Sequence, residues 1–185
     1  MQTRGARIQN HAGFSLIEVL VATSILEAAV GALAQLPIIA VRANAAARTA
    51  TVTTLLAAQK MEQLRGLAWG IDALGLPVSD VSTDLTSSPP LAGAGVGLTP
   101  SPSDALQRNT PGYCDFLDAN GRSLGGGLPP PGAFYVRRWS IDALPSSPDA
   151  LVLQVLVAKI GIAASTTERG PGKARLATLK TRTSW

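Results

Sequence analysis

The feature that most limits what this chain can fold into is a long apolar run near its start. From Phe14 to Val41 the only charged residues are Glu18 and Glu27. As an α-helix rising about 1.5 Å per residue, this run would be about 42 Å long, which exceeds the roughly 30 Å thickness of the hydrocarbon core of a bilayer. Residues 14–41 are therefore expected to form a membrane-spanning helix.

The residues before this run are in the wrong order for an ordinary secretory signal. Such a signal has a charged region, then an apolar region, and then a cleavage site made of small residues. Here residues 1–13 are polar and carry Arg4 and Arg7, and the glycine that closes them, Gly13, comes before the apolar run. Cleavage after Gly13 would keep the apolar helix in the mature protein.

This arrangement resembles the class III leader of type IV prepilins and type II secretion pseudopilins. The resemblance rests on the basic leader, on Glu18 four positions after Phe14, and on the stretch GFSLIEVLVA, residues 13–22. It implies that a prepilin peptidase cleaves between Gly13 and Phe14 and methylates the new amine of Phe14. It also implies a cytoplasmic leader, residues 1–13, and a single-pass helix in the bacterial inner membrane with the head on the outer side, before transfer to a periplasmic or extracellular filament. An uncleaved signal anchor is the alternative.

Glu18 is the residue to which the resemblance gives a role in assembly. It lies about 6 Å of helix rise from Phe14, so in a membrane its carboxylate stays near the interface and interacts favourably with the helix dipole. In a filament of packed helices, that carboxylate would meet the amine of Phe14 in a neighbouring subunit. Because an unpaired charge is costly in such surroundings, the pairing would fix the axial register between subunits. The alternative is an interfacial glutamate without a partner.

Glu27 departs from the usual pattern of the family. It lies about 20 Å into the helix and on the side opposite Glu18. One interpretation is a second polar contact inside the assembly, with Thr23, Ser24 or a partner subunit. The other is a protonated side chain that is hydrogen-bonded within its own helix. Both interpretations stay open at this point.

A second helical segment is expected over residues 42–69. Pro37 should bend the helix rather than end it, and Gly66 or Gly70 should end it. Charged and amide side chains, Lys60 among them, lie mainly off an apolar stripe that is expected to lie under a C-terminal sheet. The stripe consists of Ala43, Ala46, Ala50, Ala57, Met61, Leu64 and Ala68. The run AAQKMEQLR, residues 57–65, also looks like the matching part of V-type minor pilins and I-type minor pseudopilins, which favours a minor subunit.

The remainder of the chain is expected to form a loop and then a small sheet. Residues 70–112 are rich in Ser, Pro and Gly and lack periodicity, which is typical of a variable surface segment or a mobile one. Strand patterns follow at residues 113–117, 134–141, 151–162 and 174–184, with turns at 118–121 and 168–172. Three or four antiparallel strands packed on one helix predict an α+β fold, with residues 113–185 as a β head that resembles the head of pilins.

The sequence offers little for catalysis. The single histidine, His11, lies in the presumed leader, so a mature chain that begins at Phe14 lacks the imidazole that Ser-His-Asp triads, Cys-His pairs and histidine-ligated zinc sites need. Carboxylate-only catalysis by a pair such as Asp115 and Asp118 is the alternative for an enzyme. We expect no enzymatic activity and no cofactor.

Two further patterns have an ordinary interpretation beside a functional one. Asp115, Asp118 and Asn120 offer oxygen ligands for calcium, but Phe116 and Gly127 stand where the twelve-residue loop needs its first and last ligands, so an Asx turn is favoured and no metal is expected.

The basic residues near the end of the chain would suit DNA, yet they alternate between two faces and lack interleaved aromatic residues, so solvated charges that protect a sheet edge are favoured. These residues are Arg169, Lys173, Arg175, Lys180 and Arg182. Cys114 is expected to be a small core residue.

The sequence therefore predicts a minor pilin-like structural subunit of a type IV pilus, acting in filament assembly or in priming at the tip. The alternatives are a minor pseudopilin of a type II secretion system and a DNA-binding minor pilin for DNA uptake. The expected partners are a prepilin peptidase, other pilin or pseudopilin subunits and the inner membrane, with DNA as the least favoured partner.

Overall fold

The computed structural model of the chain describes Gly13, residues 15–161 and residues 172–184. In these ranges it contains one helix, α1 (Leu16–Gly66), and seven strands. The chain divides within α1 into two compact units, one ending at Asn44 and the other beginning at Ala45. We describe each unit by itself and call the second unit the head.

The first unit consists of the first half of α1. Pro37 lies inside the helix, which continues without an end to Gly66, as expected for both residues. Every described residue from Ser15 to Arg48 is exposed. The apolar side chains of this segment therefore have no partner within the described chain.

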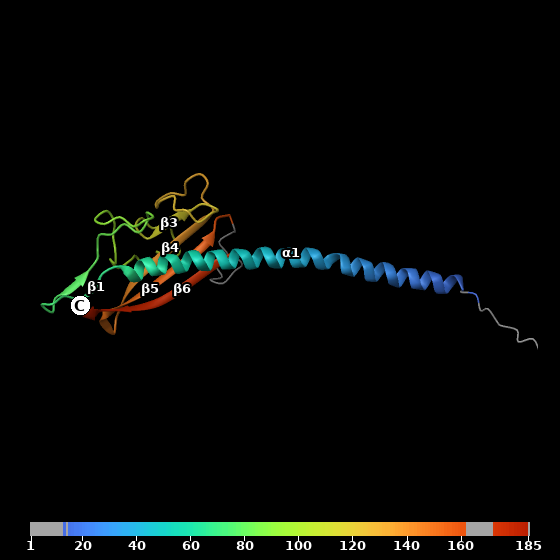
Figure 1. Ribbon diagram of the computed structural model, residues 1–185, viewed down its shortest axis with the longest axis horizontal. Coiled ribbons are helices and arrows are strands. Elements are labelled where there is room, and N and C mark those ends of the chain that lie inside the picture. Colours follow the sequence, from blue (N-terminus) through green and yellow to red (C-terminus); the bar gives the residue numbers. More distant parts are fainter. Residues whose placement is uncertain (1–12, 14, 162–171, 185) are drawn as a thin grey trace, which may run out of the picture. The chain divides into compact units, whose positions relative to one another are not determined.

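The head is an α+β unit in which the second half of α1 packs on a small antiparallel sheet (Figure 1). The sheet has the strand order β3-β4-β5-β6, and all neighbouring pairs are antiparallel. All four expected strands are present, with bounds that differ from the predicted ones by a few residues. The bounds are β3 Cys114–Leu117, β4 Tyr135–Leu144, β5 Ser147–Lys159 and β6 Lys173–Thr181. The turn expected at residues 168–172 lies outside the described residues except for Gly172.

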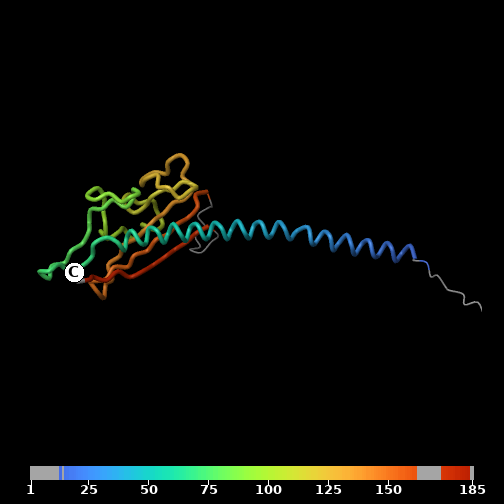
Figure 2. Tube along the Cα trace, in the orientation of Figure 1, coloured from blue at the N-terminus to red at the C-terminus, as the bar shows by residue number. Residues whose placement is uncertain are grey.

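A second, three-stranded sheet lies beside the end of the chain (Figure 2). It has the order β2-β1-β7 and consists of β1 (Trp69–Ile71), β2 (Pro77–Ser79) and β7 (Thr183–Ser184). The prediction of one strand over residues 174–184 was therefore wrong. The strand is interrupted at Arg182, whose backbone N–H donates to the carbonyl of Asp149, so that β7 leaves β5 and pairs with β1.

The core of the head lies between α1 and the inward face of the four-stranded sheet. Helix residues recur in it every three or four positions, at Thr53, Leu56, Ala57, Lys60, Met61 and Leu64. The sheet contributes alternate residues, among them Trp139, Ile141, Leu153, Val155 and Val157. Because adjacent residues of a strand point to opposite faces, this alternation fixes which residues meet the helix.

The expected helix stripe was correct only in its later part. Ala57, Met61 and Leu64 are buried, whereas four of its alanines, Ala43, Ala46, Ala50 and Ala68, are exposed. The first three precede Thr53, where burial of the helix begins, and the last lies beyond the helix end. The assignment of Lys60 to the polar face was also wrong, because its side chain is fully buried.

The segment between β2 and β3 contributes to the core and is more than a surface loop. Leu85, Leu98 and Ala105 are fully buried in it. Its turns are held by short-range bonds, such as those from the backbone N–H groups of Ser82 and Thr83 to Asp80 Oδ1 at 3.0 and 2.9 Å. The composition predicted an irregular surface segment because Ser, Pro and Gly predominate in it. The three buried apolar residues are widely spaced and form no periodic pattern.

Candidate processing and assembly site

Of the predicted processing and assembly residues, the structure describes Gly13, which precedes α1, and Glu18, which lies in its first turn. Ser15 caps the helix: its Oγ accepts a hydrogen bond from the backbone N–H of Ile17 at 3.3 Å, and its carbonyl accepts one from Glu18 at 3.0 Å. Gly13 lies before the helix and is exposed. Phe14 lies outside the described residues, so the predicted cleavage between Gly13 and Phe14 and the methylation of Phe14 stay predictions.

Glu18 is the third residue of α1 and its side chain is exposed in the first turn. Its carboxylate makes no hydrogen bond or ion pair with any described residue. A carboxylate at this position interacts favourably with the positive end of the helix dipole. The chain thus presents an unpaired acid on an apolar surface, at a place where an amine from another molecule could reach it.

Glu27 is also exposed and has no partner among the described residues. The hydroxyls of Thr23 and Ser24 donate instead to backbone carbonyls, from Ser24 Oγ to the Leu20 carbonyl at 2.8 Å for example. The described helix thus shows no contact of Glu27 with either hydroxyl, and its hydrogen bonding in a membrane stays a prediction. A contact with a partner subunit stays a prediction.

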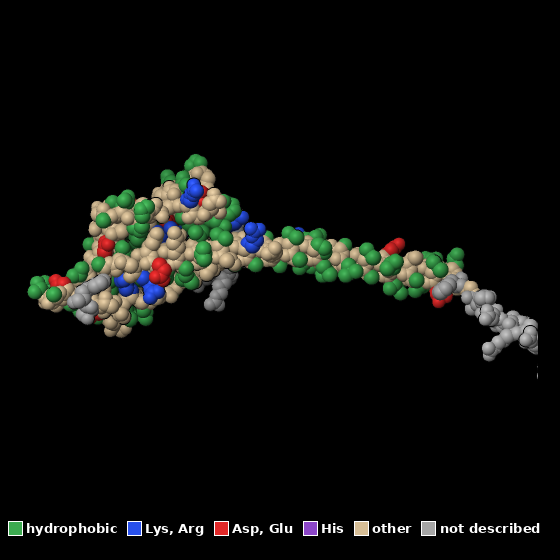
Figure 3. All heavy atoms as spheres, viewed as in Figure 1, with side chains coloured by type: hydrophobic (Ala, Val, Ile, Leu, Met, Phe, Trp, Pro, Cys, Tyr) green, Lys and Arg blue, Asp and Glu red, His purple; other side chains and the backbone are tan. Residues whose placement is uncertain are grey.

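The apolar surface around these acids is extensive. Leu16 is 82% exposed, and large apolar residues from Ile17 to Val41 are also exposed; Figure 3 shows apolar side chains along the visible face of this part of α1. The most apolar 18-residue window has a mean hydropathy of 2.0 and no buried residue, which makes α1 a candidate membrane span. Water alone does not stabilise such a surface, so it requires lipid or neighbouring helices.

The possible calcium ligands are used for structure. Asp115 pairs with two buried cations, and Asp118 Oδ1 accepts hydrogen bonds from the backbone N–H groups of Asn120 at 2.8 Å and Arg122 at 2.9 Å. The second arrangement is the expected Asx turn, and it includes Gly121 with a φ of 79°. Both carboxylates are thus engaged in contacts within the head.

The basic residues of the last strand also have structural partners. Arg182 forms an ion pair with Asp149 at 2.9 Å, stacks on the Trp69 ring at 3.7 Å and donates to the carbonyls of Gly70 and Val78. Lys180 donates to the carbonyl of Arg65 at the end of α1. These two cations tie the sheet to β1 and to α1, so the interpretation that they are merely solvated charges was wrong.

Arg175 lies on the sheet face opposite Lys180, as expected, and donates to Gln154 Oε1 at 2.6 Å. Lys173 lies on the same face as Arg175 and has an interaction of its own. Arg169 lies outside the described residues. A continuous track of available cations for a phosphate backbone is not formed by the described part of this strand.

A buried ion cluster in the head was missed by the sequence interpretation. Lys60 Nζ lies 3.2 Å from Asp115 Oδ2, and the same oxygen accepts a hydrogen bond from Arg137. Lys60 also donates to the Leu85 carbonyl and lies over the Trp139 ring at 4.6 Å. The burial of Arg137 could have been predicted from the sequence. It alternates along β4 with the same spacing as Tyr135, Trp139 and Ile141, so it faces the core with them.

The electrostatics of the head follow from burial. Loss of water lowers the pKa of Lys60 from 10.5 to about 8, although the Asp115 carboxylate partly opposes this shift. Burial raises the pKa of the Cys114 thiol, which is a core residue as expected and has little thiolate character. The cluster and the cysteine are thus parts of the scaffold.

Neither a family model, nor a curated protein, nor a solved structure matches this chain. The identification of residues 1–13 as a prepilin leader, based on the stretch of residues 13–22, accordingly stays a prediction. A function has to be argued from the chain's own residues.

Proposed function

We propose that this chain is a minor pilin-like structural subunit of a type IV pilus, which acts in filament assembly or in priming at the filament tip. The observation that carries the proposal is the helix start. An exposed glycine precedes an apolar helix whose first turn is capped by Ser15 and contains Glu18, and neither Glu18 nor the apolar surface has a partner among the described residues. In this proposal the helix is held in the inner membrane and then packs against the helices of other subunits.

The cleavage step follows from the order of these features. A prepilin peptidase would remove residues 1–13 and methylate the amine of Phe14, leaving the apolar helix at the very start of the mature chain. The Glu18 carboxylate would then pair with the Phe14 amine of a neighbouring subunit. The attraction is strong in a low-dielectric helix bundle, and leaving either charge unpaired there is costly, so the pair selects one axial offset between helices.

The head is assigned no chemistry of its own in this proposal. Its buried charges hold α1 to the sheet, its aspartates hold turns, and the mature chain would contain no histidine. A role in DNA uptake has less support, because Lys180 and Arg182 are engaged in contacts within the head.

The test is the mass of the mature N-terminus. The full chain is produced with and without a prepilin peptidase, and the product is analysed by intact-mass and N-terminal peptide mass spectrometry. We expect a chain that begins with methylated Phe14 only when the peptidase is present, and Gly13→Val should remain uncut. A product that still begins at Met1, or that begins beyond Val41, contradicts the proposal.

A further inference from the structure

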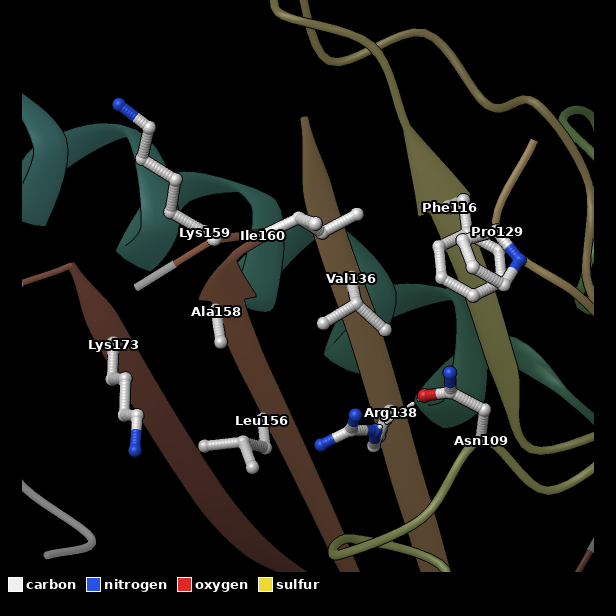
Figure 4. A pocket seen from close by; sticks show the side chains of 11 residues that line it. Asn109, Phe116, Pro129, Val136, Arg138, Leu156, Ala158, Lys159, Ile160 and Lys173 are labelled. Atoms are coloured by element: carbon white, nitrogen blue, oxygen red, sulfur yellow. Dashed lines mark hydrogen bonds between the residues drawn. The ribbon is translucent and has the colours of Figure 1, made fainter. Parts of the chain in front are cut away.

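The head has a pocket on the face of the four-stranded sheet that points away from α1. Val136 and Arg138 alternate with the helix-facing residues of β4, which places both on this outer face. The pocket has a volume of about 260 Å³. Figure 4 shows Phe116 and Pro129 on one side of it, Lys159 and Lys173 on the opposite side, and Arg138 beside Asn109.

The pocket combines an apolar wall with one oriented cation. Phe116, Val136 and Leu156 belong to three adjacent strands and form the wall. Arg138 is half-buried and is held by Nε, which donates to Asn109 Oδ1 at 2.9 Å, and by Nη1, which donates to the Leu106 carbonyl at 3.4 Å. It has no carboxylate partner in the described part of the chain. A ligand with an apolar side chain next to a carboxylate would fit this pocket, because the side chain would contact the apolar wall and the carboxylate would pair with Arg138.

The β1–β2 hairpin carries such a pair at its tip. Leu74 is 83% exposed and Leu76 is 58% exposed. Asp72 Oδ1 accepts hydrogen bonds from the backbone N–H groups of Leu74 at 2.9 Å and Leu76 at 2.8 Å, which fixes the carboxylate beside the two leucines. Among the described residues, Asp72 has no cationic partner and its Oδ2 accepts no bond.

The β1–β2 hairpin lies at one end of the head (Figures 1 and 2), and the residues that line the pocket belong to the other end. The pocket adjoins the end of the sheet where Tyr135 pairs with Lys159. The hairpin adjoins the other end, near the β4–β5 turn, because Trp69 Nε1 donates to the Asp149 carbonyl at 3.4 Å. The tip cannot reach the pocket of its own head, but it is placed to reach the pocket of another.

We propose that the β1–β2 hairpin tip of one copy of this chain docks in the outer-face pocket of a second copy. Leu74 lies against Phe116, Val136 and Leu156, and the Asp72 carboxylate pairs with Arg138. The volume of the pocket is below the roughly 300–1,000 Å³ of small-molecule sites, which suits one or two inserted side chains. Because the two surfaces are different and lie at opposite ends, the contact is heterologous and repeats along a row of heads. This inference does not depend on cleavage after Gly13.

Cysteine cross-linking of the full chain in detergent micelles tests the contact. One chain carries Ala73→Cys, which keeps both leucines of the tip, and the other carries Ala158→Cys, which lines the pocket. Mixing the two and adding a short thiol cross-linker should give a cross-linked dimer of the two chains. Either chain alone should give little cross-linked homodimer. A control pair replaces Ala158→Cys by Ala177→Cys, an exposed position on the same sheet face outside the pocket, and should give about tenfold less product.

Substitutions at the tip separate docking from association through α1. In the Ala73→Cys chain, Leu74→Ser and Asp72→Asn should each lower the yield by about tenfold, since each removes one half of the contact. Asn at position 72 keeps the oxygen that accepts the two tip N–H groups. Leu91→Ser, which changes a leucine that is 54% exposed elsewhere on the head, should leave the yield unchanged. Equal yields for the two cysteine pairs, or no effect of Leu74→Ser, would overturn the proposal.

Discussion

The Arg137 guanidinium donates two hydrogen bonds to the Asp115 carboxylate, from Nε to Oδ1 at 2.9 Å and from Nη2 to Oδ2 at 2.6 Å. Both side chains are buried between α1 and the sheet. Arg137 Nη1 also donates to the Leu56 carbonyl of α1 at 3.2 Å. The pair therefore joins β3 and β4 to the helix, and Lys60 adds a second cation to the same carboxylate.

Replacing Asp115 by Asn should destabilise the head strongly. The change leaves Lys60 and Arg137 buried without a negative charge, which typically costs about 3–5 kcal/mol in a pair of this kind. Urea unfolding of the full chain in micelles, followed by tryptophan fluorescence, measures the loss. The control is Asp104→Asn, which breaks the exposed pair with Arg108 and should cost less than about 1 kcal/mol. Equal losses for the two variants would contradict the role of the buried cluster.

The contribution of Lys60 to the stability of the head should rise with pH above about pH 8, while the buried Cys114 thiol, whose pKa is raised from 9.0, has the opposite effect in both the wild type and a variant without the lysine. Lys60 has a pKa of about 8 when folded and 10.5 as its ordinary value, because burial lowers it and Arg137 adds to this effect, while Asp115 and Asp84 oppose it. Between these values the unfolded chain holds a proton on Lys60 that the folded chain has released, so the free energy of unfolding increases with pH, in total by on the order of 3 kcal/mol. Denaturant midpoints between pH 7.5 and pH 9.5 test this increase.

Lys60→Met is the matched control for this pH dependence, because it fills the same space without a titrating group. The variant should lose the upward slope that the wild-type head shows over this range. The range stops below pH 10 because burial raises the pKa of Tyr113, and a phenol of that kind lowers stability as pH rises through its ordinary value of 10. Identical slopes for the wild type and for Lys60→Met would show that Lys60 does not release its proton there.

The helix and the main sheet could be predicted from the sequence because each repeats a simple pattern. The apolar run and the three-to-four spacing define α1, and the alternation around Trp139 defines β4. Lys60 was missed because its charge was given more weight than its position, although it lies three residues after Ala57 and four before Leu64 on the buried face. Its true environment depends on Asp115, which lies far away in the sequence.

The second sheet could not be predicted from the sequence, whereas the pairing of Glu18 could be predicted but is not tested by the structure of one chain. β1 and β2 have three residues each, too few for an alternation, and they are held by Arg182, more than a hundred residues later. Glu18 was found by its motif, but the group that it is expected to contact belongs to another molecule. Among the described residues of this one chain, its carboxylate has no partner.

Gly95→Ala should destabilise the head because the backbone of the preceding loop lies against Gly95. A Cβ at this position would lie 2.6 Å from both the backbone N of Asp84 and the carbonyl oxygen of Thr83. Backbone atoms cannot move aside as a flexible side chain can, so we expect a loss of about 1–3 kcal/mol in urea unfolding. Gly66→Ala, which has open space at the end of α1, should be neutral or slightly stabilising. A loss for Gly66→Ala as large as that for Gly95→Ala would contradict the steric explanation.

Arg182→Lys should loosen the β1–β2 hairpin while the rest of the head stays folded. Lysine keeps the positive charge near Asp149, but it loses the contact of the guanidinium with the Trp69 ring, and its one nitrogen cannot replace both Nε, which pairs with Asp149, and Nη1, which donates to the carbonyls of Gly70 and Val78. Hydrogen exchange should become about tenfold faster in β1 and β2 and remain unchanged in β4 and β5. Arg122→Lys, an exposed substitution outside this contact, serves as the control and should leave every strand unchanged.

Glu18→Ala should be processed normally but incorporated poorly into filaments. The peptidase reads the residues next to the cleaved bond, whereas Glu18 is proposed to act later, as the partner of a neighbouring Phe14 amine. Loss of one buried pairing charge should lower incorporation by about tenfold or more. The measurement is the ratio of assembled to membrane-bound chain in sheared-filament and membrane fractions, with N-terminal mass spectrometry of both. Ser24→Ala, which changes an exposed polar residue of the same helix, is the control and should assemble normally. If Glu18→Ala is cut and also assembles like the wild type, Glu18 does not set the register of the helices.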